Sequence, residues 1–374
     1  MPRITAEARL QSLFGCRKDM FYRVLSNDRI DWLRILRHVN KKLAVNIAAR
    51  SDAKDTGHPT CMIVDDTDMP KTGRKGEMLC HVLTADSDPE GSWWPNLVGP
   101  GKLIDTQKYF VICANVLGSA CGSSGPASTN PNTGRPYYFD FPKVTVRDTV
   151  RAFDLLRQHL GIERIDILIG TSMGGFMSFE WVEMCPGLFG KIFFIATGAR
   201  VTPWLAGFNA ASRLALLADP TFKEHRDLKG GMEGLKAARA IALLTYRCEE
   251  GLFKQNEDSD DTVFAGKVGS YYRHQTSKFV KDWDAYSYLY VCDEVDSNNV
   301  GRGRGGVAKA LSQIKADCTF VCMSSDELFP PEDMRPLSEM IPGSRYHQIE
   351  TPYGHDGFLI ETAAIADILR PALG

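Results

Sequence analysis

Short apolar runs recur along the chain from about residue 78, and each is followed by a polar or glycine-rich stretch. Between them, apolar residues recur every three or four positions, which predicts helices over 144–161 and 176–187, the second stopped by Pro186 and Gly187. Such alternation predicts a mostly parallel sheet covered on both faces, with functional loops at the carboxyl ends of its strands. The predicted strands lie in "MLCHVLT", "KYFVICANV", "RIDILIG", "KIFFIATG", "CTFVCM" and "RYHQIE".

Two segments depart from this alternation. Residues 18–48 have helical periodicity, and "TCMIVDD" after them has the pattern of a strand that ends in carboxylates. Residues of about 203–305 are mixed helical and charged, which predicts a helical insertion standing above the sheet. The Gly/Arg-rich stretch 298–307 follows no clear strand, so we interpret it as a link back to the core rather than a phosphate-binding loop. The predicted parts are an N-terminal segment (1–76), a first core part (77–202), a lid (203–305) and a second core part (306–374).

The composition permits one large domain with an insertion and narrows the choice of partners. A net charge of −2 gives no overall attraction to nucleic acid or to anionic membranes, although residues 1–50 are locally basic. No stretch resembles a signal peptide or reaches the roughly 20 apolar residues that span a bilayer, so we expect a cytoplasmic protein. The 10 cysteines show no paired CxxC spacing, and several lie in apolar runs. Buried thiols are therefore expected, and no metal site.

The stretch "RIDILIGTSMGGF" places Ser172 directly after a predicted strand and directly before a predicted helix. Glycines at 170 and 174 flank it in the pattern GxSxG, which permits the sharp, strained turn of a nucleophile elbow. Alternatively, Ser172 could be a non-catalytic residue in a glycine-rich turn that leads into the helix. The strand-turn-helix context favours a nucleophile.

A serine hydroxyl is a weak nucleophile and needs a histidine base, usually oriented by a carboxylate. Asp326 follows the strand in "CTFVCMSSD", although it could instead cap the next helix. His355 in "TPYGHDGFLIE" lies in a loop before the last helix, whereas His347 is interpreted as a strand residue and His159 as a helix-end residue. The resulting chain order Ser, Asp, His is that of α/β-hydrolases.

An oxyanion formed at Ser172 needs backbone N–H donors. One expected donor is the N–H of Met173, at the start of the helix after the nucleophile. The second is expected from the loop after an earlier strand, where "MLCHVLTADSD" offers Leu83. His81, at the end of that strand, is interpreted as structural.

A series of stretches from about 78 to 374 carries a resemblance to a known family: "CHVLTADSD", "WWPNLVGPGKLIDTQKYFVICANVLGSACGSSGP", "GTSMGGF", "TPWLAGFNAASRLALLADP", "AARAIALLTYR", "SKFVKDWDAYSYLY", "GRGRGGV", "SSDELFPP" and "GHDGFL". In this order they resemble the homoserine O-acetyltransferase family of the α/β-hydrolase fold. This resemblance implies an α/β architecture with an inserted helical lid. The chain departs from the family in having Phe176 and Met177 where a glutamine is usual, and in early strands that are missing or replaced.

The resemblance implies a ping-pong transfer of an acetyl group from acetyl-CoA, as co-substrate without a bound cofactor, to the hydroxyl of L-homoserine in methionine biosynthesis. By motif, Arg239 would bind the homoserine carboxylate and Asp356 its ammonium, with Tyr246 lining the pocket. Charge-assisted hydrogen bonds to a zwitterion fit this pair. Alone, Arg239 could be a solvated charge and Asp356 a helix cap. The family also suggests a homodimer formed through the lid.

Residues of about 12–76 resemble something else, an N-terminal fragment of a DDE transposase, in "KDMFYRVLSNDRIDWLRILRHVNKKL" and "CMIVDDTDMPKTGRKGE". There Asp65 or Asp66 would be the first of three metal-binding carboxylates. The others never follow, so a two-metal site is not expected. Three alternatives to the acetyltransferase stay open: an esterase, a succinyl-CoA-using transferase, and an inactive remnant of a transposon insertion.

Overall fold

The computed structural model describes residues 75–80, 94–224, 227–264 and 266–373, with only the backbone at 75–80, 224 and 253–255. Several predictions lie outside these residues: the helix over 18–48, the carboxylates Asp65 and Asp66, His81 and the oxyanion donor Leu83. The expectation of missing or replaced early strands concerns the same undescribed part of the chain.

Six strands form one parallel sheet in the order β2-β1-β3-β4-β5-β6. This confirms the α/β class predicted from the alternation of strands and helices. The first strand begins earlier than predicted, at Lys75 instead of Met78, because its pairing with β2 already starts there, with Lys75 opposite Tyr109. β3 pairs with its other side, so β1 is an inner strand. The bounds are β1 Lys75–Cys80, β2 Tyr109–Ala114, β3 Ile165–Thr171, β4 Phe189–Ile195, β5 Asp317–Met323 and β6 Arg345–Ile349.

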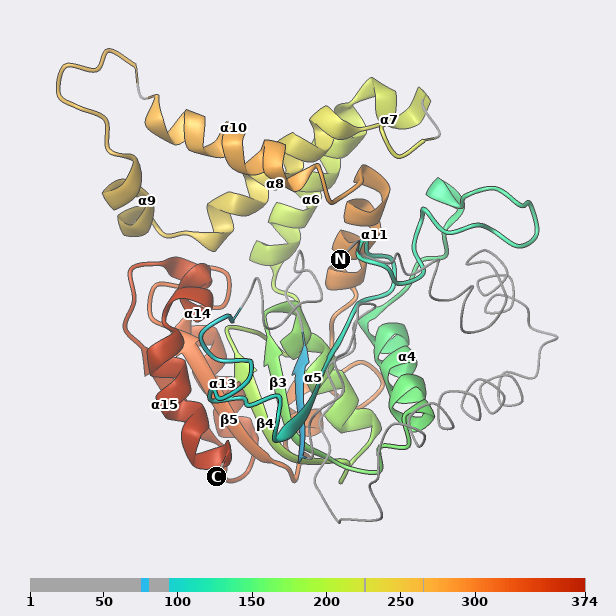
Figure 1. Cartoon of the computed structure of the whole chain (residues 1–374), viewed down its shortest axis with the longest axis vertical. Helices are drawn as coiled ribbons and strands as arrows, with labels where there is room; N and C mark the ends of the chain where they lie inside the picture. The colour runs from blue at the N-terminus through green and yellow to red at the C-terminus, as the bar shows by residue number, and fades with distance from the viewer. Residues whose placement is uncertain (1–74, 81–93, 225–226, 265, 374) are drawn as a thin grey trace.

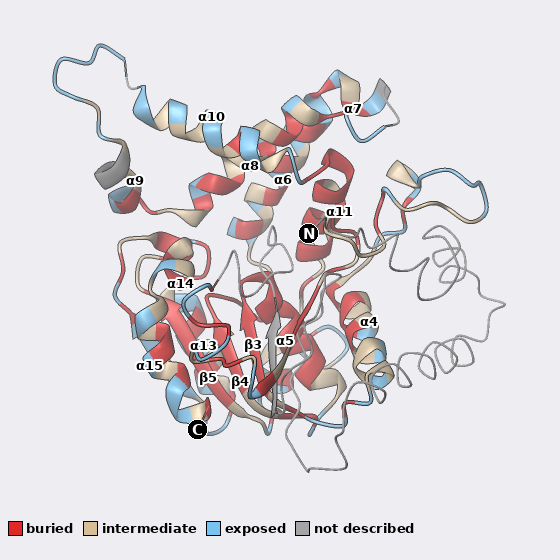
Figure 2. Ribbon diagram, in the orientation of Figure 1, coloured by how far each residue is buried: buried red, intermediate tan, exposed pale blue. Residues whose placement is uncertain are grey.

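Helices cover the sheet because its central strands are apolar on both faces. In β3 and β4 nearly every residue is buried, as expected of an inner parallel sheet (Figure 2). The helix α5, Met173–Met184, packs on β3 and β4, and Phe179 stacks on Phe194 with ring centroids 3.9 Å apart. The remaining core helices are α4 Val146–His159, α12 Val307–Leu311, α13 Pro331–Met340, α14 Gly357–Ile360 and α15 Thr362–Leu373, with the 3₁₀ turns η2 Tyr138–Asp140 and η3 Gly354–Asp356.

A group of helices occupies the range predicted as a lid and stands at one end of the sheet (Figure 1). Two of them, α6 and α8, pack against each other, and α11 leads the chain back toward the core. None of the helices in the described ranges is long and apolar enough to cross a membrane. The lid helices are α6 Pro203–Ala218, α7 Pro220–Glu224, α8 Met232–Tyr246, α9 Glu249–Asn256, α10 Lys267–Phe279 and α11 Ala285–Asp296.

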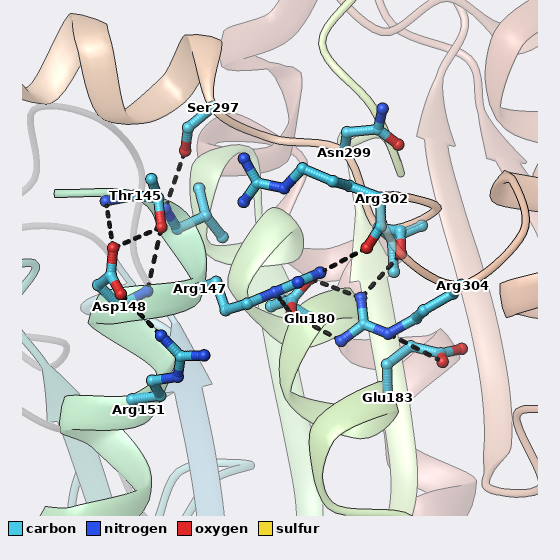
Figure 3. Close-up of polar contacts among 12 residues, drawn as sticks. Thr145, Arg147, Asp148, Arg151, Glu180, Glu183, Ser297, Asn299, Arg302 and Arg304 are labelled. Atoms are coloured by element: carbon cyan, nitrogen blue, oxygen red, sulfur yellow. Dashed lines mark hydrogen bonds and ion pairs between the residues drawn. The ribbon is translucent and has the colours of Figure 1, made fainter.

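A buried ion-pair network joins α4, α5 and the Gly/Arg-rich loop (Figure 3). Arg304 donates two hydrogen bonds to the two carboxylate oxygens of Glu180, at 2.8 and 2.7 Å, and Arg147 donates one more to each of these oxygens. Burial raises the pKa of Glu180, but its bonds to Arg304 and Arg147 more than offset this, so that its pKa lies below the ordinary value. Because the guanidinium of Arg304 is paired with Glu180, this residue holds the Gly/Arg-rich loop to α5 and is not free to bind a ligand.

A second buried carboxyl group lacks such partners. Glu294 on α11 is fully buried beside the hydroxyl of Thr149 on α4, and neither side chain makes a hydrogen bond of normal geometry within the described residues. Burial raises its pKa to about 8. The folded protein therefore binds this proton more tightly than the unfolded chain does. Protonated Glu294 therefore contributes its full stabilisation of the fold at pH values below its pKa in the unfolded chain. This contribution is lost as the pH rises through the folded-state pKa of about 8.

Replacing Glu294 by glutamine should remove this loss, because the amide keeps the shape and cannot ionise. We expect the free energy of unfolding of Glu294→Gln to exceed that of the natural chain by about 4 kcal/mol at pH 9, and to differ little from it at pH 5. Urea unfolding at the two pH values measures this. Glu339→Gln, at an exposed position of α13, is the matched control. If the stability of Glu294→Gln fell with rising pH as steeply as that of the natural chain, Glu294 would not be the source of the pH dependence.

Candidate active site

The backbone at Ser172 is strained in the way a nucleophile elbow requires. Its φ of 49° and ψ of −121° lie in a region that non-glycine residues rarely occupy, between the end of β3 and the start of α5. Two glycines let strand and helix approach this closely. A Cβ on Gly170 would collide with Ser178 and the backbone of Gly175, and one on Gly175 would collide with Thr197. The hydroxyl of Thr197 also donates a hydrogen bond to the carbonyl of Ser172.

The structure brings together the three residues proposed as a triad. Nε2 of His355 lies 2.9 Å from Oγ of Ser172, and Nδ1 lies 2.7 Å from Oδ2 of Asp326. All three side chains are buried. A carboxylate on Nδ1 selects the tautomer whose Nε2 can accept the serine proton.

Asp326 is held by the backbone that follows it. Its Oδ1 accepts hydrogen bonds from the N–H groups of Leu328 and Phe329, at 2.8 and 2.9 Å. The alternative role as a helix cap does not apply, because Pro330 is the N-cap residue of α13. Both oxygens of Asp326 are therefore occupied, and the one that faces His355 is fixed in direction.

His355 is placed by the turn η3 and by aromatic neighbours. The preceding Gly354 has a φ of +62°, and its N–H donates to Oγ of Ser325 at 2.9 Å. The imidazole ring packs among Tyr246, Phe329 and Phe358, with centroid distances of 6.0, 5.4 and 5.2 Å. The other two histidines considered lie elsewhere, His347 in β6 and His159 at the end of α4.

One of the two expected oxyanion donors lies among the described residues. Met173 is the first residue of α5, so its N–H belongs to the first turn, where no intrahelical acceptor is available. The N–H therefore sits beside the nucleophile at the positive end of the helix dipole. Leu83, the second expected donor, is outside the described residues.

The residues expected to bind homoserine lie beside His355. The guanidinium of Arg239 lies over the rings of Tyr246 and Phe279, 5.1 and 4.6 Å from their centroids. Asp356 is next to His355 in sequence and pairs through Oδ2 with Nε of Arg247, 2.9 Å away. Burial raises the pKa of Asp356, and the charge of Arg247 opposes that effect.

Sequence reasoning missed two of these neighbours, Arg247 and Phe279. Arg247 ends the stretch "AARAIALLTYR" that also holds Arg239 and Tyr246, so its position was available as a signal. Phe279 comes from α10, and no local pattern connects it with α8.

A pocket opens above Ser172, between the core and the lid. Most of its wall is apolar, and Phe176, named above as a departure from the family pattern, is part of that wall and contacts Phe329. Its polar wall comes mainly from lid helices. The lining residues are Ser172, Met173, Phe176, Leu205, Phe208, Asn209, Ser212, Ala242, Thr245, Tyr246, Tyr288, Val295, Leu328 and Phe329.

The part of the chain that the structure describes holds no cluster of three or more His, Cys, Asp or Glu side chains placed to bind a metal ion. The described cysteines are free thiols.

Comparison with known proteins places this geometry in a class. Residues 78–362 match the model of the alpha/beta hydrolase fold. The fold is also that of a solved homoserine O-acetyltransferase from Bacillus anthracis, with a TM-score of 0.74 at 23% identity over 79% of this chain and 87% of the other. The crystal structure of esterase E22 is similar too, with a TM-score of 0.72 at 23% identity over 81% and 90% of the two chains. The protein is thus an α/β-hydrolase-fold protein with a serine, histidine and aspartate site.

Sequence relatives narrow the class to one family. The homoserine O-acetyltransferase of Cyclobacterium marinum is 40% identical over 292 residues, covering 78% of this chain and 83% of the relative. That of Moorella thermoacetica is 38% identical, covering 80% and 86%. The chain belongs to the homoserine O-acetyltransferase family.

The contact between His355 and Asp326 gives a direct test of the site. Asp326→Asn should lower kcat for hydrolysis of p-nitrophenyl acetate by about 10³–10⁴-fold, because an amide stabilises the wrong imidazole tautomer. Asp317→Asn, at the other end of β5 and paired with Arg345 at the surface, is the matched control and should keep its rate. Equal rates for the two variants would remove Asp326 from the site.

Proposed function

We propose that this protein transfers the acetyl group of acetyl-CoA to the hydroxyl of L-homoserine through an acyl-enzyme on Ser172. The observation that carries the proposal is the hydrogen-bonded chain Ser172, His355 and Asp326, with Arg239 and Asp356 beside it, in a chain that belongs to the homoserine O-acetyltransferase family. The serine, histidine and aspartate can form an acyl-enzyme and then transfer its acyl group. Arg239 and Asp356 offer one cation and one anion to a zwitterionic substrate.

The first half-reaction uses the geometry at Ser172. His355 takes the proton of the serine hydroxyl through Nε2, and Oγ attacks the thioester carbon. The oxyanion is stabilised by the N–H of Met173 and, in this proposal, by that of Leu83. The carbon–sulfur bond then breaks, and His355 returns the proton to the leaving thiolate, which departs as CoA.

The second half-reaction reverses these roles with a new nucleophile. The homoserine hydroxyl gives its proton to Nε2 of His355 as its oxygen attacks the acetyl carbon, and the ester leaves when Oγ of Ser172 recovers the proton. Arg239 would bind the carboxylate and Asp356 the ammonium, with Tyr246 lining the pocket. Arg247 pairs with Oδ2 of Asp356, and its charge offsets part of the cost of burying that carboxylate, although burial still holds the pKa of Asp356 above its ordinary value.

The pocket lining favours acetyl over succinyl transfer. Among the described residues that line it there is no lysine or arginine, so a succinyl carboxylate would be buried there without a cation. An esterase of the same fold would need water at the acyl-enzyme, whereas the wall around Ser172 is largely apolar. The inner position of β1, paired on both sides, supports a folded enzyme over an inactive remnant.

Free thiol release from acetyl-CoA by the purified full-length chain tests this function. We expect release that depends on L-homoserine and vanishes in Ser172→Ala. In Arg239→Met the KM for homoserine should rise by about 10–100-fold, the usual effect of losing a hydrogen bond to a charged group. Release without homoserine would indicate a hydrolase, preference for succinyl-CoA a succinyltransferase, and a folded but silent protein an inactive remnant.

We further infer a cytoplasmic homodimer that binds no nucleic acid, formed through the lid. Helix α6 carries three exposed apolar side chains, Trp204, Leu214 and Leu217, and Leu244 on the adjacent α8 is exposed too. Trp204 and Leu214 are 56% and 70% exposed. Large apolar side chains exposed to water in one region of a protein are typical of an interaction surface. The free cysteines of the described residues fit a reducing compartment.

A charge placed on this surface should separate the subunits. Light scattering after size exclusion should show a dimer for the natural chain and a larger monomer fraction for Leu214→Glu, because a carboxylate is costly to bury in an apolar interface. Leu155→Glu, at a position on α4 that is 51% exposed, is the matched control and should stay dimeric. A natural chain that is monomeric, or two variants that behave alike, would rule out the lid as the interface.

A further inference from the structure

One polar side chain in the pocket is held rigidly and has no part in the mechanism above. Asn209 on α6 is 5% exposed and lines the pocket that opens above Ser172. Its Nδ2 donates a hydrogen bond of 2.7 Å to Oδ1 of Asp296 at the end of α11. The other oxygen of Asp296 pairs with the guanidinium of Arg213, which also lies 3.5 Å from Asp293. Three helical residues thus hold one amide in place.

The direction of this amide is fixed by the chemistry of its partner. A carboxylate that pairs with a guanidinium accepts hydrogen bonds and cannot donate one, and Asp296 pairs with Arg213 in this way. The amide of Asn209 must therefore turn its NH₂ group toward Asp296. Its carbonyl oxygen, Oδ1, is then the atom left on the other side of the side chain.

That oxygen has no donor within the described part of the chain. The hydroxyl of Ser212, one turn along α6, is directed to the carbonyl of Ala238, and that of Thr245 to the carbonyl of Ala242 at 2.8 Å. Neither proton is therefore available to Oδ1 of Asn209. Oδ1 is also not one of the fully buried polar atoms, because Asn209 borders the pocket, so a ligand there can donate an N–H or O–H group to it.

We propose that Asn209 is a substrate-binding residue whose amide oxygen accepts a hydrogen bond from an N–H group of the substrate bound above Ser172, with Asp296 and Arg213 as its positioning residues. This proposal rests on the function proposed above. Two parts of the reactants carry such an N–H: the ammonium of the amino-acid acceptor and the amides of the pantetheine arm of acetyl-CoA. Both are hydrogen-bond donors of the same kind, so the experiment must separate them.

Asn209→Ala removes the acceptor, and three substrates distinguish its possible partners. Loss of this bond should raise the KM of the substrate that supplies the N–H by about 10–100-fold for a charged donor, and less for a neutral amide, with kcat little changed. A rise confined to L-homoserine identifies the ammonium, and a rise confined to acetyl-CoA identifies the pantetheine amide. The KM for p-nitrophenyl acetate, which has no N–H, should change less than the KM of the substrate that supplies the N–H.

The positioning role has its own variant. In Asp296→Asn the partner can donate as well as accept, so the Asn209 amide can turn over and present NH₂ to the pocket. We expect the same KM to rise as in Asn209→Ala, and the KM for p-nitrophenyl acetate again to change less. Unchanged KM values in both variants would overturn the proposal.

The control for a merely structural role is Asn298→Ala. Asn298 is also nearly buried, but its Nδ2 donates to the carbonyl of Gly198 and it does not line the pocket. It should lower the melting temperature without changing either KM. If Asn209→Ala only lowers the melting temperature and kcat for all three substrates, as a loosened lid would, the proposal fails.

Failure of the proposed function can be told apart from failure of this inference. If the natural chain does not use homoserine, hydrolysis of S-acetyl-N-acetylcysteamine, which keeps one pantetheine-like amide, is compared with that of p-nitrophenyl acetate. A KM increase in Asn209→Ala for the first ester alone would support the hydrogen bond in a hydrolase. No difference between the two esters would reject it there too.

Discussion

The strained backbone of Ser172 is the constraint on which the rest of the site depends. A left-handed φ at a serine is unfavourable by itself, and it persists because β3, α5 and Thr197 leave no alternative path. Gly170 and Gly175 make that packing possible, since neither position has room for a Cβ. The same turn exposes Oγ to His355 and places the N–H of Met173 in the first turn of α5, beside the nucleophile.

The helix after the nucleophile, α5, is in turn held in place by buried ion pairs. Glu180, two turns into α5, binds Arg304 from the loop after the lid and Arg147 from α4. A buried carboxylate with both oxygens paired resists any shift of α5, because separating the pairs would leave charges without solvent. The segment that closes the lid onto the core therefore also anchors the helix that carries Met173 (Figure 3).

The lid supplies what distinguishes this pocket from a general hydrolytic site. Helices α6, α8 and α11 contribute its polar wall, while the core contributes the triad and aromatic side chains. Arg239, Tyr246 and Phe279 come together from α8 and α10, and Asp356 is held by Arg247. One cation and one anion thus lie near His355, as a zwitterionic substrate would require in the function proposed above.

The sequence alone determined the class of fold and the order of nucleophile, carboxylate and base, because hydrophobic periodicity and the glycine pattern around Ser172 are local properties. It also located Asp326 and His355, which follow predicted strands. Only the tertiary structure decided the start of β1, the pairing of Asp356 with Arg247, and the orientation of Asn209 by Asp296. These features depend on contacts between residues far apart in the chain. Pairing with β2 sets the start of β1, Asp356 meets an arginine from the end of α8, and Asn209 is oriented by a carboxylate on α11 that pairs with Arg213.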